Sequence, residues 1–465
     1  MEPEEALVND VLKFYSRELD LRGFQSCLSK FSIGKRYFSV RLLLNRLTLA
    51  CLKGPPTEIQ RHLHVKTYLR LSNPHEIPTA ALSLLHSYEQ KSAPAPLKTY
   101  STVIAQLMSV PSSLARAQAW DLFSHMRYVA HPDPDVRLYT TMIRACASPV
   151  SPTFSSEPER ALDLWTEMVF DHQLTPTTGA YNAIILACAK SGRKQYVAEA
   201  FRLAKEMMDS HRDSEGRMLY KPDRQTFAAL LEGAKRVGDL ARSRWILAEM
   251  VRLSEEDEHG DLEIDSHIMM HVFHAYASYT PPFKRSLAKM QDDPEDPQPE
   301  DQVFPVQEDS SQALRQAEMP LAGSSPAFLQ APPQSRIEVL AEAKTLFERV
   351  VSDESGSSSE RFGGVEVTPK LLSAYLSVFY RHDSLENCRH VFTSIFERFG
   401  LERTPRVLVE ALNRCAFASK SERSTSLDFG KQLMAEWMQL ENGQARVDPR
   451  LVEKAHILYI RLLSQ

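Results

Sequence analysis

The sequence predicts an all-α protein built as an α-solenoid, an elongated stack of about seven helix pairs. An apolar stripe with the spacing i, i+3, i+4 and i+7, which is one face of an α-helix, recurs along the chain. A second stripe of the same spacing follows each copy of the first. A helix pair that buries only these stripes cannot close a core alone, so it must stack on neighbouring pairs.

The first stripe occurs seven times, and four copies begin with an aromatic residue. Its copies are Tyr100, Val103, Ile104 and Leu107; Tyr139, Met142, Ile143 and Cys146; Tyr181, Ile184, Ile185 and Cys188; Phe227, Leu230, Leu231 and Ala234; Met269, Val272, Phe273 and Tyr276; Leu372, Tyr375, Leu376 and Phe379; and Leu408, Ala411, Leu412 and Cys415. The four leading aromatic residues, Tyr100, Tyr139, Tyr181 and Phe227, are 39, 42 and 46 residues apart. The repeat is therefore one helix pair long, with insertions in the loops between helices.

The second stripe predicts the second helix of each pair. Its copies are Ala119, Leu122, Phe123 and Met126; Ala161, Leu164, Trp165 and Met168; Ala200, Leu203, Ala204 and Met207; Ser243, Ile246, Leu247 and Met250; Ala343, Leu346, Phe347 and Val350; Cys388, Val391, Phe392 and Ile395; and Gly430, Leu433, Met434 and Trp437. Trp120, Trp165, Trp245 and Trp437 all fall in these second helices, where we expect them to pack in the core.

We expect four regions along the chain. Residues 1–96 form an N-terminal helical cap region, because terminal repeats present a different outer face. Residues 97–279 contain repeats 1–4 and the first helix of repeat 5. Residues 280–335 form an acidic insertion rich in Pro, Gln and Ser, which we expect to be disordered because it has few large apolar residues. Residues 336–465 contain the second helix of repeat 5, the degenerate repeats 6 and 7 and a C-terminal helix.

The net charge of −5 is concentrated in two segments. Residues 280–335 carry nine acids against four cations, and residues 255–263 carry six acids. The rest of the chain is therefore mildly basic. Such a surface permits RNA binding, but basic solenoids also bind proteins, so charge alone does not choose between these partners.

No motif for catalysis, metal binding or membrane insertion is present in the sequence. The six cysteines have no zinc spacing, and Cys146, Cys188 and Cys415 belong to apolar stripes, which indicates packing. No apolar run approaches the roughly 20 residues that a membrane helix needs. The start Met1-Glu-Pro-Glu-Glu is acidic, so no mitochondrial presequence can be recognised there. We therefore expect no enzyme activity, no cofactor and no membrane span.

The third repeat carries the most specific motif. It reads Ala180-Tyr-Asn-Ala-Ile-Ile-Leu-Ala-Cys-Ala-Lys-Ser-Gly192, continues through Glu206-Met207 and closes with Lys221-Pro-Asp223. This resembles the pentatricopeptide repeat, which has an aromatic followed by Asn, a Lys-x-Gly turn, a second helix ending in Glu-Met and a closing Pro-Asp. The rival tetratricopeptide repeat favours Trp in its first helix, and no first helix here contains one.

The resemblance implies a right-handed superhelix whose successive repeats each face one base of single-stranded RNA. In this family, the residue after the leading aromatic and the last residue of the repeat read the base together. The implied pairs are Ser101 with Asp135 (guanine), Thr140 with Thr177, Asn182 with Asp223 (uracil), and Ser373 with Thr404. The other repeats depart from the pattern, since Ala228, Met270 and Val409 stand at the first position.

Cations near the ends of three first helices are candidate phosphate contacts. They are Lys190, Arg236 and Arg381, which occupy equivalent positions in their repeats. Each of these residues, like each base-reading candidate, can also be an ordinary solvated residue on a helix surface.

The resemblance implies a non-catalytic adaptor that binds mitochondrial mRNA or rRNA in RNA processing, stability or translation. It also implies a mitochondrial location, with the cytoplasm as the alternative. The alternative function is a protein-binding helical-repeat scaffold, including a subunit associated with the mitochondrial ribosome. The sequence does not name the target RNA.

Overall fold

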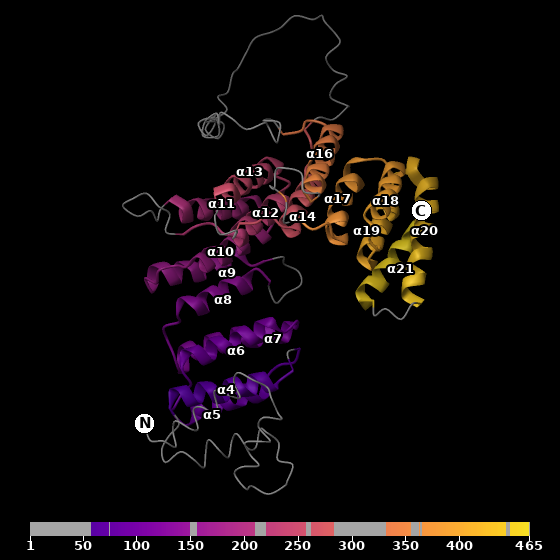
Figure 1. Ribbon diagram of the computed structural model, residues 1–465. Coiled ribbons are helices and arrows are strands. Elements are labelled where there is room, and N and C mark those ends of the chain that lie inside the picture. Colours follow the sequence, from indigo (N-terminus) through magenta and orange to yellow (C-terminus); the bar gives the residue numbers. More distant parts are fainter. Residues whose placement is uncertain are drawn as a thin grey trace, which may run out of the picture. The chain divides into compact units, whose positions relative to one another are not determined.

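The computed structural model describes residues 57–73, 75–148, 156–209, 220–256, 262–282, 332–354, 362, 365–442 and 447–464, and their regular structure is helical (Figure 1). The predicted all-α solenoid class is confirmed. The chain divides into two compact units, unit 1 (Met1–Pro222) and unit 2 (Asp223–Gln465). Residues 1–56 of the expected cap region and 283–331 of the expected insertion lie outside the described residues, and the expected domain boundaries stay predictions.

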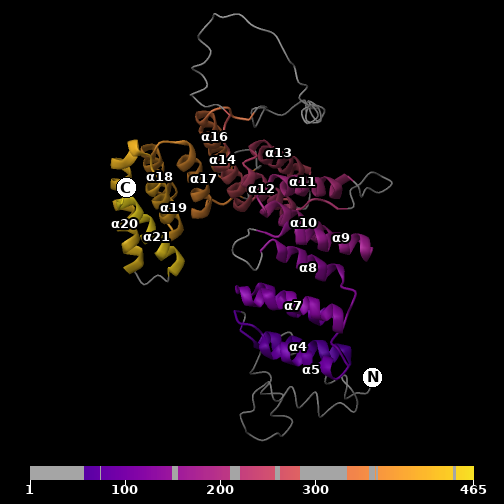
Figure 2. The same ribbon diagram turned by 180° about the vertical axis from the view of Figure 1, so that it is seen from behind.

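Unit 1 contains two layers of helices. The first layer consists of α4 (Glu58–Leu71), α6 (Leu97–Ser109), α8 (Val136–Cys146) and α10 (Thr178–Lys190). The second layer consists of α5 (Thr79–Gln90), α7 (Ser113–Val129), α9 (Pro158–Thr166), which continues into the π-helical turn η1 (Glu167–Asp171), and α11 (Lys194–Asp209). Each first-layer helix contacts the next one and its own second-layer partner (Figure 1 and Figure 2). The pair α4 and α5 extends the stack beyond the first repeat expected at residue 97.

Unit 2 repeats the same arrangement. Its first layer consists of α12 (Arg224–Val237), α14 (Ser266–Ser278), α17 (Pro369–His382), α19 (Pro405–Ala416) and α21 (Pro449–Leu463). Its second layer consists of α13 (Leu240–Glu256), α16 (Arg336–Glu354), α18 (Leu385–Phe399) and α20 (Arg423–Asn442). Neighbouring first-layer helices are again in contact. The helices α14 and α16 therefore form one repeat, although about 57 residues separate them in sequence.

The predicted stripes form the core. Tyr100, Tyr139 and Tyr181 of unit 1 are at most 1% exposed, and Cys146 and Cys188 of unit 1 and Cys415 of unit 2 are fully buried. Burial raises the pKa of these three thiols to about 12, which keeps them protonated and unreactive. The prediction that all four tryptophans pack in the core is wrong for Trp245, which is 54% exposed. Trp245 lies between the buried stripe positions of α13 and therefore on the outward face of that helix.

Two helices end at glycines in the left-handed conformation. Gly238 (φ 74°) ends α12, and Gly400 (φ 60°) ends α18. A Cβ atom at Gly238 would lie 2.9 Å from the carbonyl oxygen of Ser278, at the end of the neighbouring first-layer helix α14. Glycine at this position therefore provides both the backbone turn and the close approach of two repeats.

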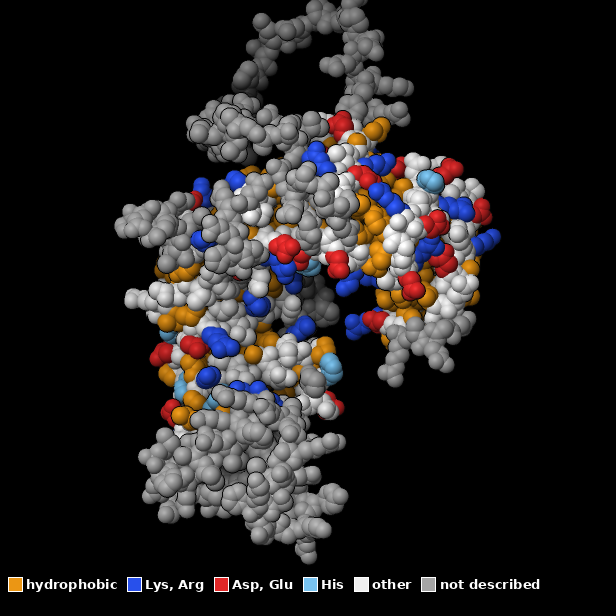
Figure 3. Space-filling view, viewed as in Figure 1, with side chains coloured by type: hydrophobic (Ala, Val, Ile, Leu, Met, Phe, Trp, Pro, Cys, Tyr) orange, Lys and Arg blue, Asp and Glu red, His pale blue; other side chains and the backbone are white. Residues whose placement is uncertain are grey.

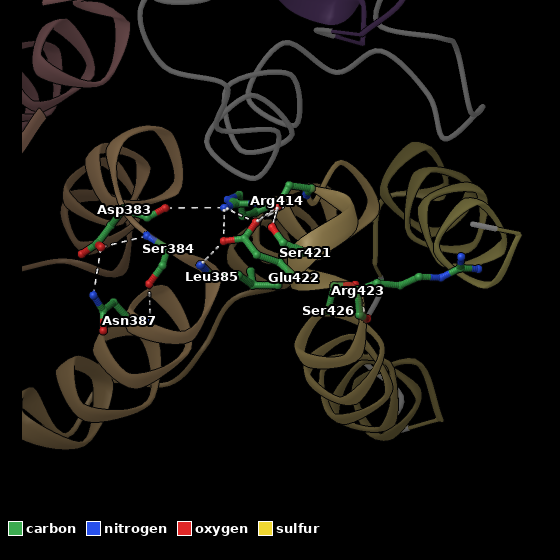
Figure 4. Close-up of polar contacts among 10 residues, drawn as sticks. Asp383, Ser384, Leu385, Asn387, Arg414, Ser421, Glu422, Arg423 and Ser426 are labelled. Atoms are coloured by element: carbon green, nitrogen blue, oxygen red, sulfur yellow. Dashed lines mark hydrogen bonds and ion pairs between the residues drawn. The ribbon is translucent and has the colours of Figure 1, made fainter. Parts of the chain in front are cut away.

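Polar contacts also tie successive repeats together in unit 2 (Figure 4). The Glu422 carboxylate accepts a hydrogen bond from the backbone N–H of Leu385 at 2.7 Å, at the start of α18, and pairs with Arg414 of α19 at 3.1 Å. Burial alone would raise the pKa of Glu422, but these two donors hold it below its ordinary value. Glu422 therefore remains ionised and fixes the end of α19 against the start of α18.

Among the helices of the described residues, none combines the length and the apolar character needed to cross a bilayer.

Candidate functional site

The residues after the leading aromatics lie at the fifth position of adjacent first-layer helices, at the start of the second turn. Ser101, Thr140 and Asn182 occupy this position on α6, α8 and α10. The Ser101 hydroxyl donates to the Leu97 carbonyl at 3.1 Å, and the Thr140 hydroxyl donates to the Val136 carbonyl at 2.7 Å. Because these protons are used by the helix backbone, both hydroxyls offer oxygen lone pairs to a ligand.

These positions are largely enclosed between neighbouring helices. Ser101 is 9% exposed and Asn182 is 4% exposed, whereas Thr140 is half-buried. Little of the Ser101 and Asn182 side chains is therefore accessible to solvent.

The closing residues of the repeats have a structural role that sequence reasoning missed. Asp135, Thr177 and Asp223 are the N-caps of α8, α10 and α12, and each accepts a hydrogen bond from the third backbone N–H of its helix. The distances are 2.8, 3.2 and 2.8 Å. A Ser, Thr or Asp directly before an apolar helical stripe is the ordinary signal for this cap, so the pattern was available in the sequence.

The structure places the implied pairs in different ways. Ser101 on α6 and Asp135 at the start of α8 belong to neighbouring first-layer helices, and so do Thr140 and Thr177. Asn182 belongs to unit 1 and Asp223 to unit 2.

The fourth pair is in unit 2. Ser373 on α17 is 8% exposed, and its hydroxyl donates to the Glu410 carboxylate of α19. Thr404 is the N-cap residue of α19, but its side chain makes no capping hydrogen bond. The Ser373 proton is therefore already used within the protein.

The three candidate phosphate contacts differ in their surroundings. Arg236 donates to the Glu232 carboxylate at 2.6 Å, so its charge is compensated within α12. Burial alone would raise the pKa of Glu232, but Lys235 and Arg236 hold it below its ordinary value. Arg381 is exposed in the last turn of α17, and Lys190 is half-buried at the end of α10.

A second set of cations, which sequence reasoning missed, lies at the opposite end of the first-layer helices. Lys98 and Arg137 stand two residues before the leading tyrosines, in the first turns of α6 and α8, and both are exposed. Within the described residues neither side chain forms an ion pair. Lys66 of α4 and Lys98 both lie close enough to His62 to lower its pKa, in addition to the larger effect of burial. We call Lys98 and Arg137 the basic edge.

The basic edge concentrates positive potential. The N-terminal turn of a helix already carries exposed N–H groups and a partial positive charge, so a cation there costs about 0.3–1 kcal/mol. In α6 the N-cap is Pro96, which has no side-chain cap, and the first turn has no acid. In Figure 3, Lys and Arg side chains lie over α6 and α8 on the face of unit 1 in view. This arrangement favours an anion such as a phosphate.

Unit 2 has cations at the equivalent first-turn positions. They are Lys370, Arg406 and Arg450, and Arg406 pairs with Glu410 at 3.2 Å. These cations could have been recognised in the sequence, because Lys98, Arg137, Lys370 and Arg406 each stand two residues before the first residue of a stripe.

Among solved structures, those of the pentatricopeptide repeat protein PPR10 match this chain. A complex with an 18-nt psaJ RNA element matches at 13% identity with a TM-score of 0.30, over 90% of this chain and 53% of that chain. A cysteine-to-serine variant in complex with the same RNA element gives the same values. PPR10 from maize matches at 13% identity with a TM-score of 0.30, over 98% of this chain and 72% of that chain.

These solved structures are of a pentatricopeptide repeat protein, the kind of protein that the motifs of this chain resemble. The chain spans about half the length of the first of these structures. No protein-family model matches the chain, and no curated protein matches it in sequence.

The N-cap role of the closing residues makes a direct prediction. Replacing Asp135 with Ala removes the acceptor for the Leu138 N–H and should destabilise α8 by about 1 kcal/mol, whereas Asp135→Asn retains an acceptor and should change little. Hydrogen exchange of the α8 amides measures the difference. Asp163→Ala, at an exposed position inside α9, is the control, and equal protection in Asp135→Ala and the wild type would contradict the cap.

Proposed function

We propose that the chain binds single-stranded RNA along the first-layer helices of unit 1. The observation that carries this proposal is the basic edge, because the cations Lys98 and Arg137 in the first turns of α6 and α8 reduce helix stability and are suited to bind phosphates. Ser101 and Thr140 lie near the basic edge, because each stands three residues after its cation, Lys98 or Arg137, on the same helix. The phosphates would set position and affinity, and the polar side chains would contact the bases.

A single strand suits this surface better than a duplex. The polar residues are enclosed between helices, so only a base that is not paired can present its edge to them. Ser101 offers a hydroxyl lone pair, and Asp135 offers a carboxylate at the start of the next helix. These two acceptors match the donors of guanine, N1–H and N2–H₂, which is the base that the motif resemblance implies for this pair.

We further propose that the chain is a non-catalytic adaptor for mitochondrial RNA in processing, stability or translation. This part rests on the resemblance of the motifs to pentatricopeptide repeats. A protein-binding scaffold associated with the mitochondrial ribosome is the alternative, and the mildly basic body of the chain fits that partner as well.

The basic edge predicts a salt-dependent affinity. Lys98→Gln combined with Arg137→Gln should weaken binding of a random single-stranded RNA and reduce the slope of log K against log salt by about 1.4, because two phosphate contacts are lost. Fluorescence anisotropy at a series of salt concentrations measures both quantities. Lys194→Gln is the matched control, since Lys194 is exposed at the start of the second-layer helix α11. An unchanged slope in the double variant would exclude these contacts.

The Ser101 and Asp135 pair predicts a change of base preference. Ser101→Asn should move the preference at one nucleotide from guanine to uracil, because an amide replaces the hydroxyl beside the same carboxylate. Sequencing of RNA selected from a random pool by each protein measures the preference. Thr102→Asn, on the next residue of α6, is the control. Selection of the same motif by wild type and Ser101→Asn would show that Ser101 reads no base.

The proposed adaptor role predicts which RNA the chain contacts in cells. Sequencing of crosslinked RNA should return mitochondrial mRNA or rRNA, and the Lys98→Gln, Arg137→Gln variant should recover much less of it. Recovery of cytosolic transcripts would contradict the mitochondrial role. Co-purification of ribosomal proteins without crosslinked RNA would favour the scaffold.

A further inference from the structure

The last turn of α5 contains a carboxylate that neither the repeat packing nor the RNA proposal explains. Glu89 is the penultimate residue of α5, and its side chain is only 7% exposed. A carboxylate is unfavourable there, because the unpaired carbonyl groups at the end of a helix already create a negative potential. In the described residues no Lys or Arg side chain pairs with Glu89. This position therefore favours a cation.

Two imidazoles converge on this carboxylate. Nδ1 of His86 and Nε2 of His125 each lie 2.9 Å from the same Glu89 oxygen, Oε2. His86 and Glu89 are separated by one turn of α5, and His125 comes from α7, the next second-layer helix. The three ligand atoms lie within 4.8 Å of one another, and only modest adjustment would place them around one ion of the size of Zn²⁺.

The remaining oxygen of Glu89 is held by a further residue. Tyr100 donates its hydroxyl proton to Oε1 of Glu89 at 2.5 Å. Burial alone would raise the pKa of Glu89, but the hydrogen bonds from Tyr100, His86 and His125 keep it below its ordinary value. The carboxylate is therefore ionised and oriented, with Oε2 directed at the imidazoles. Orientation of a ligand by such a partner is a recurring property of protein metal sites.

We propose that His86, Glu89 and His125 form a zinc site that joins α5 to α7. Two imidazoles and one carboxylate are a donor set that zinc accepts, with water in the fourth position. The imidazoles are partly exposed, 47% for His86 and 40% for His125, so the ion has a path from solvent. The ion links two successive helix pairs, and Tyr100 connects it to the first-layer helix α6.

The zinc site does not depend on RNA binding. Its ligands lie on second-layer helices, and its test measures the metal alone. Failure of the zinc experiments leaves the RNA proposal unaffected, and the reverse also holds.

The test is titration of the full chain with Zn²⁺ by calorimetry, and with Co²⁺ by visible absorption. The wild type should bind Zn²⁺ at one site that is weakened at least about 10-fold in His125→Ala, and bound Co²⁺ should show the absorption of a low-symmetry site in the wild type but not in His125→Ala. His390→Ala, at an exposed histidine of α18, is the matched control and should bind like the wild type. Tyr100→Phe keeps all three ligands and should weaken binding about 10-fold.

Hydrogen exchange distinguishes this site from zinc bound elsewhere. Zn²⁺ should slow exchange in the last turns of α5 and α7 of the wild type and of His390→Ala, but not of His125→Ala or His125→Gln. The side chain of His125→Gln can still donate a hydrogen bond to Glu89. This variant therefore separates loss of the metal from loss of the hydrogen bond that His125 makes to Glu89 without metal. The proposal is overturned if the wild type binds no Zn²⁺, if His125→Ala binds it equally well, or if Zn²⁺ protects neither helix end.

Discussion

The structure depends on one interaction, the burial of a single apolar stripe per helix against the neighbouring pair. Each large side chain of a stripe contributes about 1.5–3 kcal/mol when it is fully buried, and most of these side chains are buried. No pair closes a core alone, so neighbouring first-layer helices must lie side by side within each unit. Their N-terminal turns then recur along one edge, where both the caps and the basic edge lie.

This stacking gives the closing residue of each repeat two roles. Asp135 and Thr177 are the last residues of their repeats and also the caps of the next first-layer helices. Only Ser, Thr, Asp and Asn fill the capping role well, with Gly close behind. The side chains that can contact a ligand at this position are therefore restricted by the fold itself. An Asp at this position is thus weaker evidence for base recognition than the residue after the aromatic, where the helix imposes no such choice.

The sequence predicted the stripes well because the 3.6-residue period is local and was repeated many times. The exposure of Trp245 could also have been predicted from this period, because Trp245 does not lie on the helix face that Ser243, Ile246 and Leu247 share. The basic edge was harder to recognise, because Lys98 and Arg137 look like ordinary surface cations until the stack aligns their helices. The zinc cluster had no local signature, since His125 is 36 residues from Glu89 and only the contact between repeats brings them together.

In unit 1, some charged side chains at both ends of the helices have the sign that the helix dipole disfavours. Lys98 and Arg137 place positive charge where the helix dipole is positive, and Glu89 places negative charge where it is negative. A helical stack has no need of either, because the buried stripes already hold it together. Such local conflicts concentrate at functional positions, where a ligand of opposite charge removes the conflict. A phosphate would do this at the basic edge and a metal ion at Glu89. The two departures therefore point to two different ligands.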